Sequence, residues 1–317
     1  MADFKDNRFF TMFSRSDDAV PGEGGNYGFL ASLEQSKGWR RNMRSRVIAG
    51  IPALILILAA VTWAPVKLVG LLVVVAGGYG IREYVKLLKN GFGFAPPQAP
   101  MIASAVVVGL GGLFGGQQGM QAMFFVSALF MVFWVWFRDT PDTPRQFQNA
   151  GAALLGLMLV PWLINHVTLL LQLPDGNGSV ARGAVNFLIM VLTLNDTAAY
   201  VVGSLMGKRP LIPSVSPNKT VEGAIGGLIG GLCGGLISWS WLGGGVLNLG
   251  VFELSVLGIM LAAVAQGGDL LESKLKRLTY ADDSGTFLPG HGGILDRMDS
   301  YLLAGPALYY FLQAFYL

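Results

Sequence analysis

The sequence predicts an all-α, polytopic integral membrane protein with about nine transmembrane helices. The chain of 317 residues is 53% hydrophobic and only 13% charged, and its mean hydropathy is +0.54. This composition is too apolar for an ordinary soluble domain. Apolar runs long enough to cross about 30 Å of hydrocarbon recur along the chain. The runs are residues 47–65, 66–86, 99–116, 120–137, 149–173, 184–206, 221–242, 250–268 and 299–317.

Basic residues gather in alternate loops between these runs. If the N-terminus is cytoplasmic, the inner segments next to the runs hold 16 Lys and Arg residues, and the outer loops hold only Lys67 and Arg182. This asymmetry agrees with the positive-inside rule. We therefore expect a multi-pass protein with a cytoplasmic N-terminus. The sequence shows no Ser- and Arg-rich transit peptide, which favours a bacterial inner (plasma) membrane.

Polarity divides the chain into three parts. Residues 1–46 are expected to form a polar cytoplasmic N-terminal segment, and residues 47–173 a set of N-terminal transmembrane helices. Residues 174–317 are expected to form a C-terminal transmembrane catalytic region, because both polar clusters described below lie there.

A run of glycines within residues 221–242 has two interpretations. Glycines spaced one, three and four apart on a helix make a groove that another helix can approach closely. A phosphate-binding loop would instead sit where a strand meets a helix, and this run is apolar and long enough to span, so we favour packing. Small-residue faces would also suit a homodimer. The glycines are Gly223, Gly226, Gly227, Gly230, Gly231, Gly234 and Gly235.

The first polar cluster begins at Asp196, inside the predicted span 184–206. A carboxylate at that depth is costly, so it is either functional or paired inside the helix bundle. The inner loop that follows combines cations and hydroxyls with three prolines that stiffen the backbone. Such groups suit a polyphosphate. They include Lys208, Ser216, Lys219 and Thr220.

The second polar cluster is residues 266–300, between two apolar runs. Asp269 and Glu272 are three residues apart, as are Asp296 and Asp299, so each pair shares a helix face. Oxygen ligands without a Cys–His cluster favour a hard cation such as magnesium. An alternative is a solvated interfacial loop with salt bridges. The neighbouring bases, which could neutralise phosphate charge, include Lys276, Arg277 and Arg297.

Both clusters carry motifs that resemble a known family. S-x-L-K-R at 273–277, followed by PGHGGILDRMD at 289–299, is similar to the signature of the phosphatidate cytidylyltransferase (CDP-diacylglycerol synthase) family. Residues 196–223 resemble the second block of that family. Asp282 stands where the family pattern has Lys. The matching signature residues are Ser273, Lys276, Arg277, Asp283, Pro289, His291, Gly292, Gly293, Asp296, Arg297 and Asp299.

The resemblance implies that CTP and phosphatidate react to give CDP-diacylglycerol and pyrophosphate, with the lipid bilayer as a partner and no nucleic acid. It implies Mg²⁺, with room for a second cation, held by Asp269, Asp296, Asp299 and Glu272. The expected catalytic residues are Asp269, Asp296, Asp299, Lys276, Arg277 and Arg297. The expected substrate-binding residues are Lys219, Thr220, Ser216, Lys208, Ser273, His291, Gly292 and Gly293.

Two other functions fit parts of the sequence. A membrane transporter would suit the intramembrane Asp196 and the glycine-rich spans, but the charges gather on one side of the membrane. A CTP-dependent polyprenol or phytol kinase would need a base to deprotonate a hydroxyl group, and the full match at 289–299 argues against it.

Overall fold

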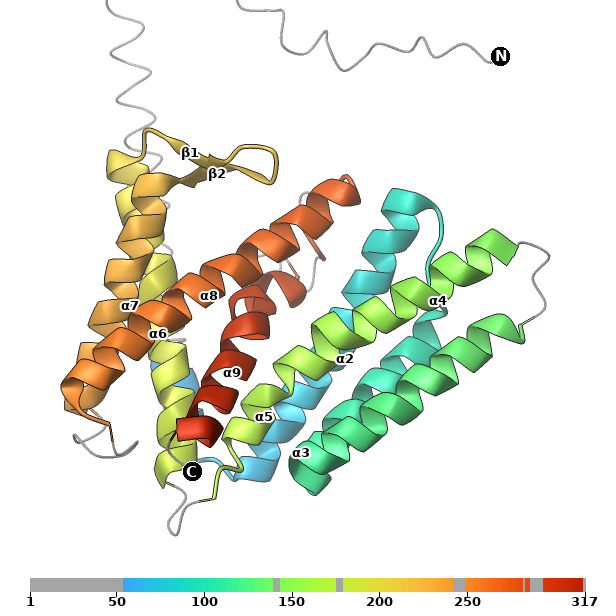
Figure 1. Cartoon of the computed structure of the whole chain (residues 1–317), viewed down its shortest axis with the longest axis horizontal. Coiled ribbons are helices and arrows are strands. Elements are labelled where there is room, and N and C mark those ends of the chain that lie inside the picture. The colour runs from blue at the N-terminus through green and yellow to red at the C-terminus, as the bar shows by residue number, and fades with distance from the viewer. Residues whose placement is uncertain are drawn as a thin grey trace, which may run out of the picture. The chain divides into compact units, whose positions relative to one another are not determined.

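The computed structural model describes residues 54–138, 143–174, 179–241, 249–281, 283–285 and 293–315, and these are almost entirely helical (Figure 1). The predicted N-terminal segment 1–46 lies outside the described residues. After a short apolar helix, Leu54–Trp63, the helices are α2 Val66–Phe92, α3 Gln98–Trp136, α4 Thr143–Leu157, the π-helical turn η1 Met158–Trp162, α5 His166–Leu170, α6 Ser179–Met206, α7 Val221–Trp241, α8 Val251–Leu278 and α9 Leu295–Phe315. The strands are β1 Pro210–Ile212 and β2 Ser216–Thr220.

Six helical segments in the described part of the chain are long and apolar enough to cross a membrane. This confirms an all-α protein able to span a bilayer several times, whereas the count of nine and the orientation of the N-terminus stay predictions. The six are Val66–Phe92, Gln98–Trp136, Pro144–Leu170, Val180–Met206, Val221–Ser240 and Val251–Leu278.

The difference from nine has identifiable causes. The predicted runs 99–116 and 120–137 fall within one element, α3, which folds back on itself at Gly116, where φ is 59° and ψ is −151°. Its two arms touch, since the hydroxyl of Ser127 donates to the carbonyl of Ser104 at 3.5 Å. Residues 299–315 of the last run fall in α9, which carries Asp296 in its first turn and is not one of the six. Only part of the first run is described.

The glycines of α7 line two faces of the helix, and each face packs against a different neighbour. A side chain at Gly226, Gly230 or Gly234 would meet α6, and one at Gly231 or Gly235 would meet the backbone of α8. Helices α6, α7 and α8 therefore adjoin one another (Figure 1). The packing interpretation of the glycine run is confirmed. Both faces are used within the chain, so they give no support to the predicted homodimer.

The predicted stiff loop between α6 and α7 contains an antiparallel hairpin of β1 and β2, with Ile212 opposite Ser216 and Pro210 opposite Thr220. The carboxylate of Glu222, in the first turn of α7, accepts hydrogen bonds from the backbone N–H groups of Lys208 at 3.1 Å and Arg209 at 3.2 Å. The hydroxyl of Thr220 accepts one from Gly223 N at 3.1 Å and so caps α7. The hairpin is thereby tied to the start of α7.

One close contact between α7 and α8 gives a stability prediction. A Cβ at Gly258 would collide with the carbonyl oxygen of Gly231, so Gly258→Ala should lower the free energy of unfolding by about 1–3 kcal/mol. Gly151→Ala is the matched control, because nothing lies within 4 Å of a Cβ there. Thermal unfolding of both variants in detergent measures the difference. Equal melting temperatures for the two variants would contradict the close α7–α8 contact.

Candidate functional site

A cavity of about 450 Å³ lies among α6, the hairpin, the start of α7 and α8. Three of the predicted site residues, Lys219, Thr220 and Asp269, line it, and so does Asp196. The sequence placed these groups in two clusters more than 40 residues apart, and the fold brings them to one cavity. The full lining is Asn195, Asp196, Ala199, Tyr200, Gly203, Ser204, Leu211, Asn218, Lys219, Thr220, Gly223, Ala224, Gln266, Asp269 and Leu270.

The ammonium group of Lys219 and the carboxylate of Asp269 form an ion pair in this cavity. Lys219 comes from the end of β2 and Asp269 from α8, so the pair joins the hairpin to the helix. Both side chains are half-buried, at 29% and 32% exposure. An ammonium and a carboxylate that face a cavity can each exchange this partner for a ligand of opposite charge, so the pair can receive an anion and a cation together.

A chain of amide side chains supports Asp196 within the cavity. Asn195 Nδ2 donates to Asp196 Oδ1 at 2.9 Å, and Gln266 Nε2 donates to Asn195 Oδ1 at 2.9 Å. A side chain at Gly227 would collide with both amides, so this glycine makes room for them. Asp196 is therefore both hydrogen-bonded and turned to the cavity. Asn195 and Gln266 were missed as site residues, although amides inside apolar spans follow the same rule that identified Asp196.

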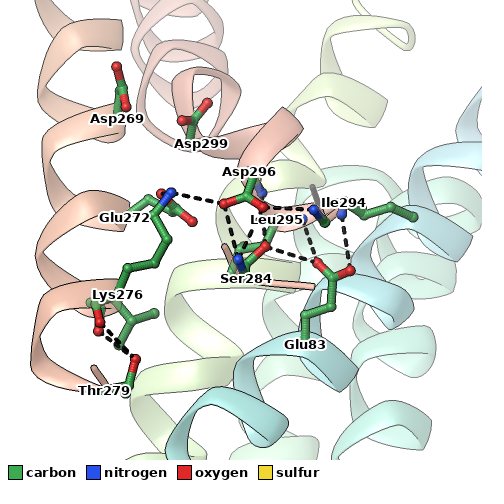
Figure 2. Close-up of polar contacts among 12 residues, drawn as sticks. Glu83, Asp269, Glu272, Lys276, Thr279, Ser284, Ile294, Leu295, Asp296 and Asp299 are labelled. Carbon is green, nitrogen blue, oxygen red and sulfur yellow. Dashed lines mark hydrogen bonds and ion pairs between the residues drawn. The ribbon is translucent and has the colours of Figure 1, made fainter. Parts of the chain in front are cut away.

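A second polar group connects α8 to α9 and is centred on Lys276 (Figure 2). The ammonium nitrogen lies 2.6 Å from Glu272 Oε2 and 2.9 Å from Asp296 Oδ1. Glu272 is only 2% exposed, and the Lys276 side chain 16%. Glu272 and Lys276 are four residues apart on α8, one helical turn, while Asp296 reaches them from the first turn of α9. We call Glu272, Lys276 and Asp296 the α8–α9 ion cluster.

Asp296 has further partners in the backbone. Its Oδ2 accepts hydrogen bonds from Gly293 N at 2.7 Å and from Ser284 N at 3.1 Å. Ser284 in turn accepts a hydrogen bond from Asp296 N through its hydroxyl at 3.3 Å. Asp296 therefore holds the backbone of Ser284 and of Gly293 next to the first turn of α9.

The predicted magnesium ligands separate into two groups. Glu272 and Asp296 are engaged with Lys276, whereas Asp269 and Asp299 lie apart from that ion pair in Figure 2. Asp299 is close enough to Asp269 and Asp196 to interact with their charges. Within the described ranges, no group of three or more His, Cys, Asp or Glu residues is placed to hold a metal ion. Asp269 lines the cavity and Asp299 interacts with its charge, and both are hard oxygen donors of the kind that suits magnesium, so they fit the predicted role better than the other two.

The remaining predicted site residues lie at several places. Lys208 and Ser216 belong to the hairpin region but do not line the cavity, and Ser273 is buried in α8. Arg277 and Arg297 are exposed, in the last turn of α8 and the first turn of α9. His291 and Gly292, and also Asp282, lie outside the described residues.

One buried acid was missed entirely. Glu83, in α2, is 7% exposed, and its carboxylate accepts hydrogen bonds from Leu295 N at 2.8 Å, Ile294 N at 3.1 Å and the hydroxyl of Ser284 at 3.3 Å (Figure 2). The sequence did hold a signal, because Glu83 is an acid inside the predicted span 66–86. What it binds, however, lies more than 200 residues away along the chain.

Comparison with known proteins agrees with the sequence motifs. A phosphatidate cytidylyltransferase of Staphylococcus saprophyticus is 46% identical over 122 residues, which are 38% of this chain and 46% of that protein. An uncharacterised protein of Escherichia coli K12 is 34% identical over 171 residues, 54% of this chain and 56% of that protein. In both cases the match spans about half the length of the relative.

A third relative matches most of the chain. A phosphatidate cytidylyltransferase of Mycobacterium bovis is 28% identical over 273 residues, which are 83% of this chain and 85% of that protein. Residues 44–315 match the sequence pattern of the cytidylyltransferase family, so the match includes both the cavity and the α8–α9 ion cluster. The chain therefore belongs to the cytidylyltransferase family.

Proposed function

We propose that the protein is a phosphatidate cytidylyltransferase, which transfers CMP from CTP to phosphatidate and releases pyrophosphate. The observation that carries this proposal is the pairing of Lys219 with Asp269 inside a cavity of about 450 Å³. The volume falls within the range of small-molecule sites. Lys219 could bind a phosphate there and Asp269 a cation. Membership of the cytidylyltransferase family indicates that the nucleotide is CTP. Family membership does not favour the transporter or the polyprenol or phytol kinase.

The transfer of CMP to phosphatidate does not need a strong general base. A phosphate oxygen of phosphatidate attacks the α-phosphorus of CTP, the bond from that phosphorus to the bridging oxygen breaks, and pyrophosphate leaves. The attacking phosphate is already anionic near neutral pH, so no hydroxyl has to be deprotonated. The barrier comes from bringing two anions together, and catalysis is then mainly positioning and electrostatic stabilisation.

Basic residues from β2, α8 and α9 would bind the phosphates of the two substrates. Lys219 would bind CTP phosphate in the cavity, having exchanged Asp269 for the nucleotide. Lys276 in α8 and Arg297 in α9 would contribute positive charge toward the phosphate of phosphatidate. Lys276 is held by two acids, so its position is fixed before substrate arrives.

Magnesium belongs to this proposal. Asp269 and Asp299 would hold it, because their oxygens are hard donors that are not engaged with Lys276. Bound there, the ion would neutralise phosphate charge as a Lewis acid. The released Lys219 would then be free for phosphate, so cation and nucleotide binding would favour one another.

The proposed setting is a bilayer, with the active site facing the cytoplasm of a bacterial inner membrane. Phosphatidate keeps its acyl chains in the hydrocarbon region, and the six apolar segments provide the surface beside which they would lie. CTP is a cytoplasmic solute, and Lys219, from one of the basic loops predicted on that side, lines the cavity. A homodimer stays a prediction.

The proposed activity gives a direct test. Purified protein incubated with phosphatidate, magnesium and CTP labelled on the α-phosphorus should yield labelled CDP-diacylglycerol, identified by mass. Label in a phosphorylated polyprenol or phytol, offered in a parallel incubation with γ-labelled CTP, would instead support the kinase. If the protein modifies neither lipid, the proposed activity is wrong.

Lys219→Met tests the cavity as the nucleotide site. We expect the KM for CTP to rise by about 10- to 100-fold, because hydrogen bonds to charged groups contribute about 1.5–3 kcal/mol. The matched control is Lys89→Met, which removes an exposed lysine in the last turn of α2. Steady-state kinetics measure both variants. An unchanged KM for Lys219→Met would place the nucleotide elsewhere.

Removal of divalent cations tests the metal role. Excess chelator should stop turnover, and added magnesium should restore it, because the carboxylates of Asp269 and Asp299 cannot themselves bind phosphate. Asp269→Asn should raise the magnesium concentration needed for half-maximal rate. Full activity of the wild-type protein in excess chelator would contradict the metal argument.

A further inference from the structure

The first turn of α9 is held by a carboxylate from a distant helix. The first N–H groups of a helix have no partner inside it, and an acid near them is favoured by the helix dipole. Such an acid normally precedes the helix in sequence. Here Glu83 of α2 supplies it, accepting from Ile294 N at 3.1 Å and Leu295 N at 2.8 Å.

Glu83 is also linked to Asp296 through a shared hydroxyl. Ser284 Oγ donates to Glu83 Oε2 at 3.3 Å and accepts from Asp296 N at 3.3 Å. The backbone N–H of the same Ser284 donates to the Asp296 carboxylate. One residue therefore connects the acid of α2 to the acid that pairs with Lys276.

Two glycines let the backbone come this close. A side chain at Gly285 would collide with the carboxylate of Glu83, and one at Gly293 would collide with both Glu83 and the hydroxyl of Ser284. The backbone at Gly285 and at Gly293 is thus fitted around the Glu83 side chain. Burial of a carboxylate is costly unless its oxygens are satisfied, and at this site each oxygen of Glu83 has a donor.

We propose that Glu83 is a positioning residue of the active site: it fixes the first turn of α9, and through Ser284 it sets Asp296 and the Lys276 ammonium for the transfer step. This inference rests on the proposed function for its kinetic consequences, although the contacts themselves do not. Glu83 is not among the residues that line the cavity and is not part of the Lys219–Asp269 pair. Its effect should therefore fall on kcat and leave CTP binding nearly unchanged.

The first experiment compares Glu83→Gln with Tyr84→Phe in the full-length protein. Tyr84 is the adjacent residue of α2, is 1% exposed and donates a hydrogen bond to Ala152 O at 2.9 Å, so its variant also loses one buried hydrogen bond but at a different place. Glu83→Gln should lower kcat by about 10- to 100-fold, as expected for a displaced catalytic group, with the KM for CTP changed less than about threefold. Tyr84→Phe should leave both parameters near the wild-type values.

A second variant tests the route through Ser284. Ser284→Ala should lower kcat as Glu83→Gln does, and the double variant should lose little more than either single one, because residues acting through one another are not additive. Fully additive losses would overturn the proposed link. Ser284→Ala also keeps the test decisive if Glu83→Gln does not fold, since a wild-type kcat in the serine variant overturns the proposal.

A measurement without turnover separates this inference from the proposed function. Hydrogen–deuterium exchange of the Ile294 and Leu295 amides should be faster in Glu83→Gln than in wild type and unchanged in Tyr84→Phe. If the wild-type protein makes no CDP-diacylglycerol, the proposed function fails, and amide exchange still decides whether Glu83 positions α9. Unchanged exchange, or a wild-type kcat in Glu83→Gln, overturns the inference.

Discussion

The arrangement of Glu83, Asp296 and Lys276 depends on which groups accept hydrogen bonds from the backbone N–H groups at the start of α9. Backbone N–H groups at the start of a helix need acceptors, and inside an apolar bundle water cannot supply them freely. Glu83 and Asp296 fill this need from opposite sides, with Ser284 between them. Because Asp296 is also the partner of Lys276, the same hydrogen bonds that complete the helix fix a buried cation.

The glycines of α7 impose the other constraint. They allow α6 and α8 to approach α7 so closely that backbone atoms touch, which sets the distance across the cavity. Asp196 and Gln266 then face the same space from two helices, although each lies in an apolar run. Larger side chains on α7 would separate these helices. The packing that stabilises the bundle is thus also what assembles the polar cavity.

The two lysines of the site are each held by carboxylates. Lys219 faces Asp269, and Lys276 faces both Glu272 and Asp296. A charge in surroundings of low polarity is costly unless it is paired, so removing either carboxylate partner would leave a lysine at a cost. The pairs differ in accessibility. The Lys219 pair is half-buried at a cavity and suited to exchange partners, whereas the α8–α9 ion cluster is nearly enclosed and suited to hold a position.

The sequence by itself determined the helical class, the apolar segments, the packing role of the α7 glycines and the two polar clusters, because each is a property of neighbouring residues: hydrophobicity, spacing along one helix, or an acid where hydrocarbon is expected. Only the tertiary structure decided which acids meet which bases. Asp269 looked like the partner of Glu272, one turn away, but it pairs with Lys219 of the hairpin. The sequence around Glu83 did not indicate a contact with α9. Its donors are backbone N–H groups more than 200 residues later, and every residue except proline carries the same group. A hydrogen bond from a backbone N–H group does not depend on which side chain its residue carries. Such contacts therefore cannot be predicted from the sequence and are seen only in the tertiary structure.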